Sequence, residues 1–147
     1  MDGGNDIRGA VHTNVRHDSA VKPVSGKAVY IDDMPKPPGT QEVALLLSPH
    51  AHAKILSIET GEAAAMPGVH GVVTAADIPG VNDVAPVFKD EPALADGVVE
   101  YAGMPVAAVA ADTYDQALAA VRAVRVAYEE LTPVLSIEEA WEKEQFT

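Results

Sequence analysis

The longest apolar run in the sequence, residues 106–111, is the feature that most limits how the chain can fold. It is apolar on both faces of an extended chain, which is typical of a strand buried in the middle of a core. It is far shorter than the roughly 20 residues of a membrane-spanning helix. A Gly-Met-Pro turn at residues 103–105 precedes it, and residues 98–101 before the turn favour another strand. We therefore expect a core built around one fully buried strand.

Three more short apolar runs predict strands, at residues 43–47, 55–58 and 69–73. Between the second and third of these lies an alanine-rich segment that predicts a helix of one or two turns. Thr60 can cap its start, and the Pro-Gly pair at residues 67–68 ends it.

The clearest helix begins at Thr113, which has the spacing of a capping box with Gln116. Its expected apolar stripe comprises Tyr114, Ala117, Leu118, Val121 and Val124. From residue 124 to 128 the apolar period becomes two, which indicates a half-buried strand. Ser136 and Glu139 form a second capping box and predict a last helix through residue 141.

Short strands mixed with few helices, without regular βαβ alternation, predict an α+β fold. At 147 residues the chain is expected to form one domain. Aromatic residues make up only 5% of it, so the core must consist of Ala, Val, Ile and Leu. We expect a flexible arm over residues 1–19 and the folded domain over residues 20–147.

The charge and cysteine counts exclude several classes of function. Ten basic and 22 acidic residues give a formal net charge of -12, which disfavours binding to nucleic acids and to anionic membranes. The chain has no cysteine, so disulfides, thiolate zinc sites, iron–sulfur ligation and cysteine nucleophiles are excluded within it. The first residues lack the apolar segment of a signal peptide, and a cytoplasmic location is expected.

His50 and His52 are the only pair that suggests a metal site. On a strand their side chains would share one face, but a site needs two more ligands that the sequence does not nominate. The alternative is that Pro49 starts a turn and both histidines are surface or packing groups. His70, inside a strand run, is interpreted as a packed or edge residue.

The acid pairs Asp32–Asp33 and Asp90–Glu91 could suggest acid–base chemistry, but neighbours on an extended chain point to opposite sides. Asp33 is expected to bond the backbone in a turn. In the loop at residues 79–83, Gly80 and Asn82 tolerate positive φ. Spacing alone assigns no catalytic, cofactor-binding or metal residue.

Taken in order, several segments of the chain resemble one known domain. They are residues 26–33 (GKAVYIDD), 48–55 (SPHAHAKI), 66–69 (MPGV), 80–83 (GVND), 90–91 (DE), 99–109 (VEYAGMPVAAV) and 126–131 (VAYEEL). This series resembles the α/β-hammerhead domain that opens the molybdenum-binding subunit of the xanthine dehydrogenase and aldehyde oxidase family. The resemblance covers roughly residues 17–141. The lead-in at residues 17–20 (HDSA) is most similar to the bacterial xanthine dehydrogenase large subunit.

The resemblance implies a role in an enzyme that hydroxylates a carbon of a purine or an aldehyde, with xanthine or hypoxanthine favoured. In that family water supplies the oxygen at a molybdenum–pterin centre, and electrons pass through two [2Fe–2S] clusters to FAD and then NAD. The family's catalytic and pterin-binding residues lie beyond this domain, so none is carried over to this chain. The implied partners are the remainder of the molybdenum-binding subunit and the iron–sulfur/FAD subunit or domains. The chain by itself is expected to be inactive and to be one domain of a longer subunit.

Two alternatives remain open from the sequence. One is a stand-alone binding module with a metal at His50 and His52. The other is an acidic protein-interaction domain, which would need an exposed apolar patch. A domain normally covered by the rest of a subunit is also expected to self-associate at high concentration.

Overall fold

The computed structural model describes residue 17 and residues 19–145, which fall into two compact units divided between Pro37 and Pro38. The predicted arm at residues 1–19 lies almost wholly outside the described residues. The first unit contains helix α1 (Val21–Val24) and the short 3-10 helix η1 (Ile31–Asp33).

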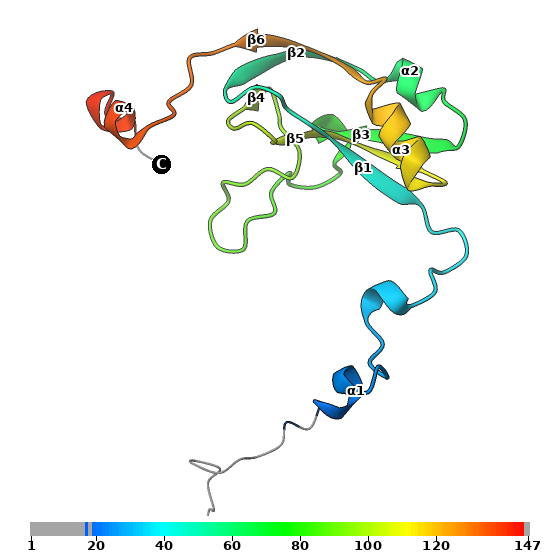
Figure 1. Cartoon of the computed structure of the whole chain (residues 1–147). Coiled ribbons are helices and arrows are strands. Elements are labelled where there is room, and N and C mark those ends of the chain that lie inside the picture. The colour runs from blue at the N-terminus through cyan, green and yellow to red at the C-terminus, as the bar shows by residue number, and fades with distance from the viewer. Residues whose placement is uncertain (1–16, 18, 146–147) are drawn as a thin grey trace, which may run out of the picture. The chain divides into compact units, whose positions relative to one another are not determined.

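The second unit contains two antiparallel sheets of three strands each (Figure 1). In the first sheet the strand order is β1 (Glu42–Leu47), β5 (Pro105–Ala111) and β3 (Val69–Thr74). Strand β5 therefore pairs on both sides, which confirms that residues 106–111 form the central strand.

In the second sheet the order is β4 (Val98–Val99), β2 (Ala53–Glu59) and β6 (Arg125–Glu130). The strands β4 and β5 flank the predicted Gly-Met-Pro turn but belong to different sheets. The turn is bonded instead to the end of β1, because the Ser48 amide donates to the Met104 carbonyl and the Gly103 amide donates to the Ser48 carbonyl. Through this turn the chain passes from the second sheet to the first.

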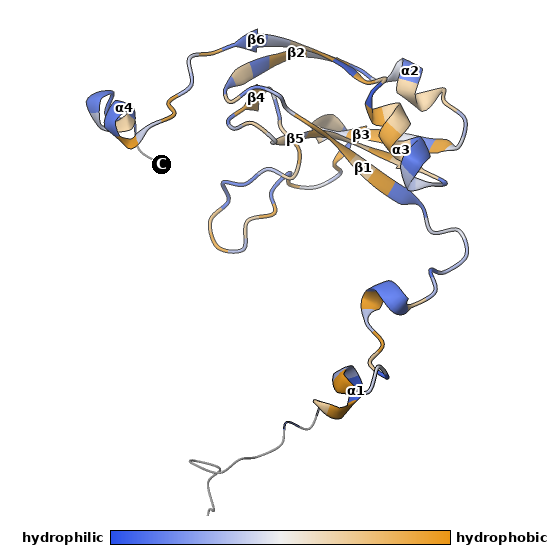
Figure 2. Ribbon diagram, viewed as in Figure 1, coloured by the Kyte–Doolittle hydropathy of each residue, from blue (hydrophilic) through white to orange (hydrophobic). Residues whose placement is uncertain are grey.

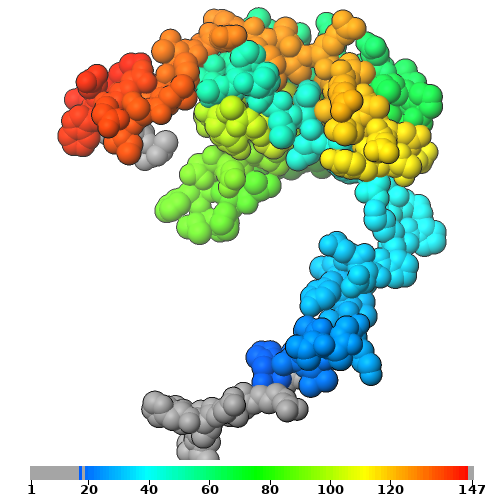
Figure 3. All heavy atoms as spheres, in the orientation of Figure 1, coloured from blue at the N-terminus to red at the C-terminus, as the bar shows by residue number. Residues whose placement is uncertain are grey.

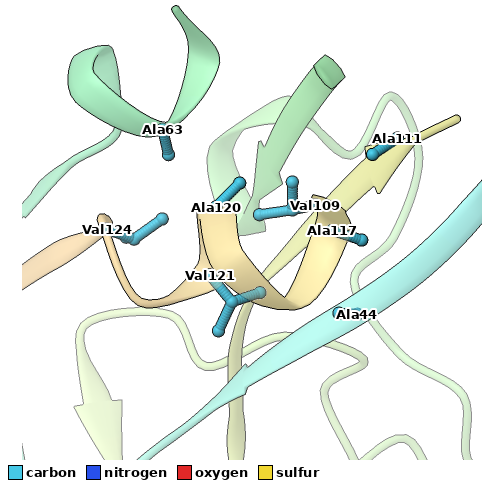
Figure 4. Close-up of a cluster of buried hydrophobic side chains, with 8 residues drawn as sticks. All are labelled: Ala44, Ala63, Val109, Ala111, Ala117, Ala120, Val121 and Val124. Atoms are coloured by element: carbon cyan, nitrogen blue, oxygen red, sulfur yellow. The ribbon is translucent and has the colours of Figure 1, made fainter. Parts of the chain in front are cut away.

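Helix α3 (Tyr114–Val121) covers one face of the β1-β5-β3 sheet, and helix α2 (Gly61–Ala64) lies against β3 and α3. The buried cluster between them, shown in Figure 4, consists of Ala44, Ala63, Val109, Ala111, Ala117, Ala120, Val121 and Val124. The predicted stripe is wrong at Tyr114, which is 54% exposed, and it omits Ala120, which is fully buried. The helix turns its smallest side chains to the sheet, which lets the two backbones approach closely.

A second buried cluster lies where the sheets meet. Val106 of β5 packs there with Ala53 of β2 and Val99 of β4, together with Ala95 and Met104. The remaining elements are the 3-10 helix η2 (Ala75–Asp77) and helix α4 (Ile137–Glu142).

Both predicted capping boxes are half formed. The Thr113 hydroxyl accepts a hydrogen bond from the Gln116 amide, but the Gln116 side chain accepts from that same hydroxyl. At α4 the Ser136 hydroxyl accepts from the Glu139 amide, whereas the Glu139 carboxylate accepts from the Leu135 amide.

The predicted cap of α2 at Thr60 is wrong. Its side chain makes no capping hydrogen bond, and its own backbone is already helical, with φ -105° and ψ -10°. An N-cap side chain reaches the first-turn amides from an extended backbone, which Thr60 does not adopt.

Gly68, between α2 and β3, supplies a first testable prediction. Its φ is +80°, and a Cβ there would overlap the side-chain amide of Gln116, whereas Gly97 has φ +78° with open space around it. We expect Gly97→Ala to lower the free energy of unfolding by about 1–2 kcal/mol, the cost of a left-handed alanine. Gly68→Ala should cost more than this, measured by urea denaturation. Adding Gln116→Ala to each glycine variant should reduce the loss only at Gly68; equal losses throughout would contradict the overlap.

Candidate functional site

The two histidines of the predicted metal pair lie in the bends between β1 and β2, so the prediction that they share a strand face is wrong. The His50 ring packs on Tyr128 with centroids 4.8 Å apart, and its Nδ1 lies 3.5 Å from Glu130 Oε1. The His52 Nδ1 lies 3.2 Å from the Thr132 carbonyl. Each imidazole thus has a different partner, as expected of packing and surface groups. Within residues 17 and 19–145, His, Cys, Asp and Glu side chains nowhere gather in threes that could hold a metal ion.

Buried polar groups around this turn are satisfied locally. Ser48 is 3% exposed, and its hydroxyl accepts a hydrogen bond from the His50 amide at 3.1 Å. Burial raises the pKa of the Tyr128 hydroxyl above its ordinary value, and a hydrogen bond with Ser48 offsets part of that rise. The phenol therefore stays neutral at physiological pH.

The two acid pairs are exposed and lie in separate parts of the chain. Asp33 accepts a hydrogen bond from the Tyr30 amide at 3.0 Å, so it bonds the backbone as expected, but at the start of η1 rather than in the proline turn that follows. Asp90 and Glu91 lie in a long loop, where the Glu91 carbonyl accepts from the Val84 amide at 2.9 Å.

His70 is an edge residue, as predicted. It lies on β3, an outer strand of its sheet, at a register irregularity between Val69 and Gly71. Its Nε2 is 2.6 Å from Asp112 Oδ1, and both side chains are exposed. An exposed pair of this kind adds little stability.

Neither Gly80 nor Asn82 uses the left-handed conformation that the loop prediction allowed. The Asn82 side chain instead bonds both sides of Leu94, donating to its carbonyl at 2.7 Å and accepting from its amide at 3.1 Å. This amide ties together two points of the chain twelve residues apart.

The most distinctive surface is the face of the β1-β5-β3 sheet opposite α3. We call it the open face: Val43, Leu45, Leu47, Gly71, Val73, Ala108 and Ala110. The strand register places Ala108 between Leu45 on one side and Val73 on the other, so the side chains form continuous rows. The four large side chains on it remain 40% to 53% exposed, and none of the seven residues is charged. Figure 2 shows that β1 is apolar over most of its length, after a hydrophilic start at Glu42.

An apolar patch that spans three strands is typical of an interaction surface. The opposite face carries Ala44 and Val109, which are buried under α3, so the sheet is apolar on both sides but covered on one. Sequence reasoning missed this face. The signal for it lies at residues 43–47, which are all apolar and show no alternation with polar residues. Such a run is unexpected in β1, because β1 is an outer strand.

Comparison with known proteins identifies the fold. The profile of the family described as "Aldehyde oxidase and xanthine dehydrogenase, a/b hammerhead domain" matches residues 25–132. The chain belongs to this family. It is 47% identical over 131 residues to xanthine dehydrogenase of Oryza sativa subsp. japonica, and 43% identical over 132 residues to that of Calliphora vicina. These matches cover 89% and 88% of this chain.

A solved structure gives the same result. Quinoline 2-oxidoreductase from Pseudomonas putida 86 superimposes with a TM-score of 0.77 and 35% identity, over 87% of this chain and 17% of that chain. The α+β hammerhead fold predicted from the sequence is therefore confirmed. The chain spans only about a tenth of the length of the curated relatives it matches.

The chain offers no ligand set for an iron–sulfur cluster. Iron–sulfur clusters are held by cysteine thiolates, and this chain has none. The part of the chain that the structure describes also lacks a cluster of metal-ligating side chains. In that same part, no helix has the length and apolar character needed to cross a bilayer.

Proposed function

We propose that the chain is a scaffold domain of the molybdenum-binding subunit of a xanthine dehydrogenase-like enzyme. One observation carries this proposal: a hammerhead domain that makes up about a tenth of its relatives leaves a three-stranded apolar face uncovered. Burying such a face against another part of the same subunit would stabilise it by roughly 25 cal/mol for each Å² of apolar surface removed from water.

In this proposal the whole enzyme hydroxylates xanthine or hypoxanthine. Water supplies the oxygen, and two electrons per turnover leave through [2Fe–2S] clusters and FAD to NAD. The molybdenum–pterin cofactor and every catalytic residue belong to parts outside this chain. The contribution of residues 20–147 is to pack against the remainder of the subunit and hold it in place.

The substrate assignment follows the relatives named xanthine dehydrogenase. The family profile also includes aldehyde oxidases, so an aldehyde is the second candidate substrate. We place the enzyme in the cytoplasm, with the iron–sulfur/FAD subunit or domains as its further partners.

The test is native purification from the source cell with an antibody raised against this chain. We expect a polypeptide far heavier than 15.4 kDa that contains molybdenum and reduces NAD with xanthine. Reduction with an aldehyde but not with xanthine would move the assignment to the second substrate. A free 15.4 kDa protein without molybdenum would refute the proposal, and the open face would then belong to an independent interaction domain. The purified chain alone should oxidise neither hypoxanthine nor xanthine.

A further inference from the structure

The segment between Asn82 and Leu94 is a loop with two fixed ends. Leu94 is 7% exposed and Ala95 is 1% exposed, and the Ala95 amide donates to the Pro105 carbonyl at 2.7 Å. The Asn82 side chain holds the other end to Leu94 by two hydrogen bonds. The loop is therefore attached to the core cluster where the two sheets meet.

Inside these ends the chain closes again. The Val84 amide donates to the Glu91 carbonyl at 2.9 Å, and the Ala85 amide donates to the Asp83 carboxylate at 2.8 Å. We call residues 84–91 the clasped loop. It projects from the body of the second unit (Figures 1 and 3).

The clasped loop carries three large apolar side chains that are uncovered. Phe88 is 74% exposed, Val87 is 78% exposed and Val84 is 60% exposed. The chain has only two phenylalanines, so one of its few large aromatic side chains lies where water surrounds it. A partner that buried Phe88 would gain more contact area than from any aliphatic side chain on this loop.

Its hydrogen bonds also lower the cost of docking. A loop that is ordered before binding loses less conformational entropy when its side chains are seated. An aromatic side chain with two torsions on such a loop has the properties of an interface anchor.

We propose that the clasped loop inserts Phe88 and Val87 into an apolar pocket of the same enzyme subunit, outside residues 1–147. This inference rests on the proposed function, which places about nine tenths of the relatives' length beyond this chain. Lys89 and then Asp90 and Glu91 follow the apolar tip, so this segment is negative on balance, and the chain carries a net charge of -12; the rim of the receiving pocket is therefore expected to be basic.

Hydroxyl-radical footprinting of the native full-length protein tests the insertion directly. In the 147-residue chain, Phe88 at 74% exposed and Tyr114 at 54% exposed should both be oxidised readily. In the native protein the oxidation rate of Phe88 should fall about tenfold or more, since interface cores pack like protein interiors. Tyr114, an exposed aromatic residue on α3, is the matched control and should keep a rate close to that of the chain.

Trypsin cleavage after Lys89, the residue next to Phe88, gives a second readout. Phe88→Ser in the full-length protein should accelerate this cleavage about thirtyfold, the effect of losing an interface anchor. Tyr114→Ser should leave the rate unchanged. Both residues are exposed in the 147-residue chain. Neither substitution should therefore change the melting temperature of that chain.

The outcomes separate the two proposals. Unprotected Phe88 in a heavy, molybdenum-containing protein would overturn the insertion and leave the scaffold role standing. Equal protection of Phe88 and Tyr114 would also overturn it, because the burial would not be specific to the clasped loop. A free 15.4 kDa protein would remove both proposals.

Discussion

Replacing Val109 by aspartate is expected to prevent the chain from folding. Val109 is completely buried on β5, paired with Ala44 of β1 and Val72 of β3 and covered by α3. A carboxylate there would lie in an apolar cluster with no partner, and an uncompensated buried charge costs several kcal/mol. That loss is comparable to the whole stability of a typical domain, about 5–15 kcal/mol. Circular dichroism should show loss of the sheet signal at neutral pH.

Two controls make this result specific to the buried charge. Val109→Ala removes only apolar contact and should cost about 1.5–3 kcal/mol, leaving a folded chain. The loss in Val109→Asp should be smaller in acid, because burial raises the pKa of the carboxyl and protonation removes the charge. A Val109→Asp chain with the parent's urea midpoint would show that β5 is not the centre of the core.

The same strand shows what sequence can establish about this fold. Six consecutive apolar residues at 106–111 predict a central strand, and the structure places them between β1 and β3. The expected burial of both faces is only partly right, because Ala108 and Ala110 lie on the open face. Tyr114 was misassigned because helical period alone does not reveal where the sheet ends beneath a helix. Its position in the first turn of α3 lies beyond the covered stripe.

The candidate site was harder to predict, and for a physical reason. A run such as residues 43–47 is apolar on both sides of the strand. A buried central strand has this pattern, and so does an outer strand with one uncovered apolar face. Only the strand order distinguishes them, and pairing between β1 and β5 links residues 58 to 69 apart in sequence. Asn82 was missed in the same way, since its bonds to Leu94 depend on how the loop closes.

Replacing Leu45 by aspartate should abolish self-association of the isolated chain without unfolding it. Leu45 is 48% exposed in the middle of the open face, so the new carboxylate would remain hydrated in the monomer. When two open faces meet, water is removed and the charge is left without a partner, at a cost of about 3–5 kcal/mol. This should weaken association by at least about a hundredfold. Light scattering over a dilution series measures the change.

Leu56→Asp is the matched control, because Leu56 is 62% exposed on β2 of the other sheet. Leu56→Asp adds the same single negative charge to the chain. A general effect of charge repulsion between chains would therefore appear in both variants. Loss of association only in Leu45→Asp would locate the contact on the open face. Equal association of the two variants, or a parent chain that stays monomeric at high concentration, would show that this face is stable in water. The exposed rows of Val43, Leu45 and Val73 would then not be the surface through which the domain meets the rest of its subunit.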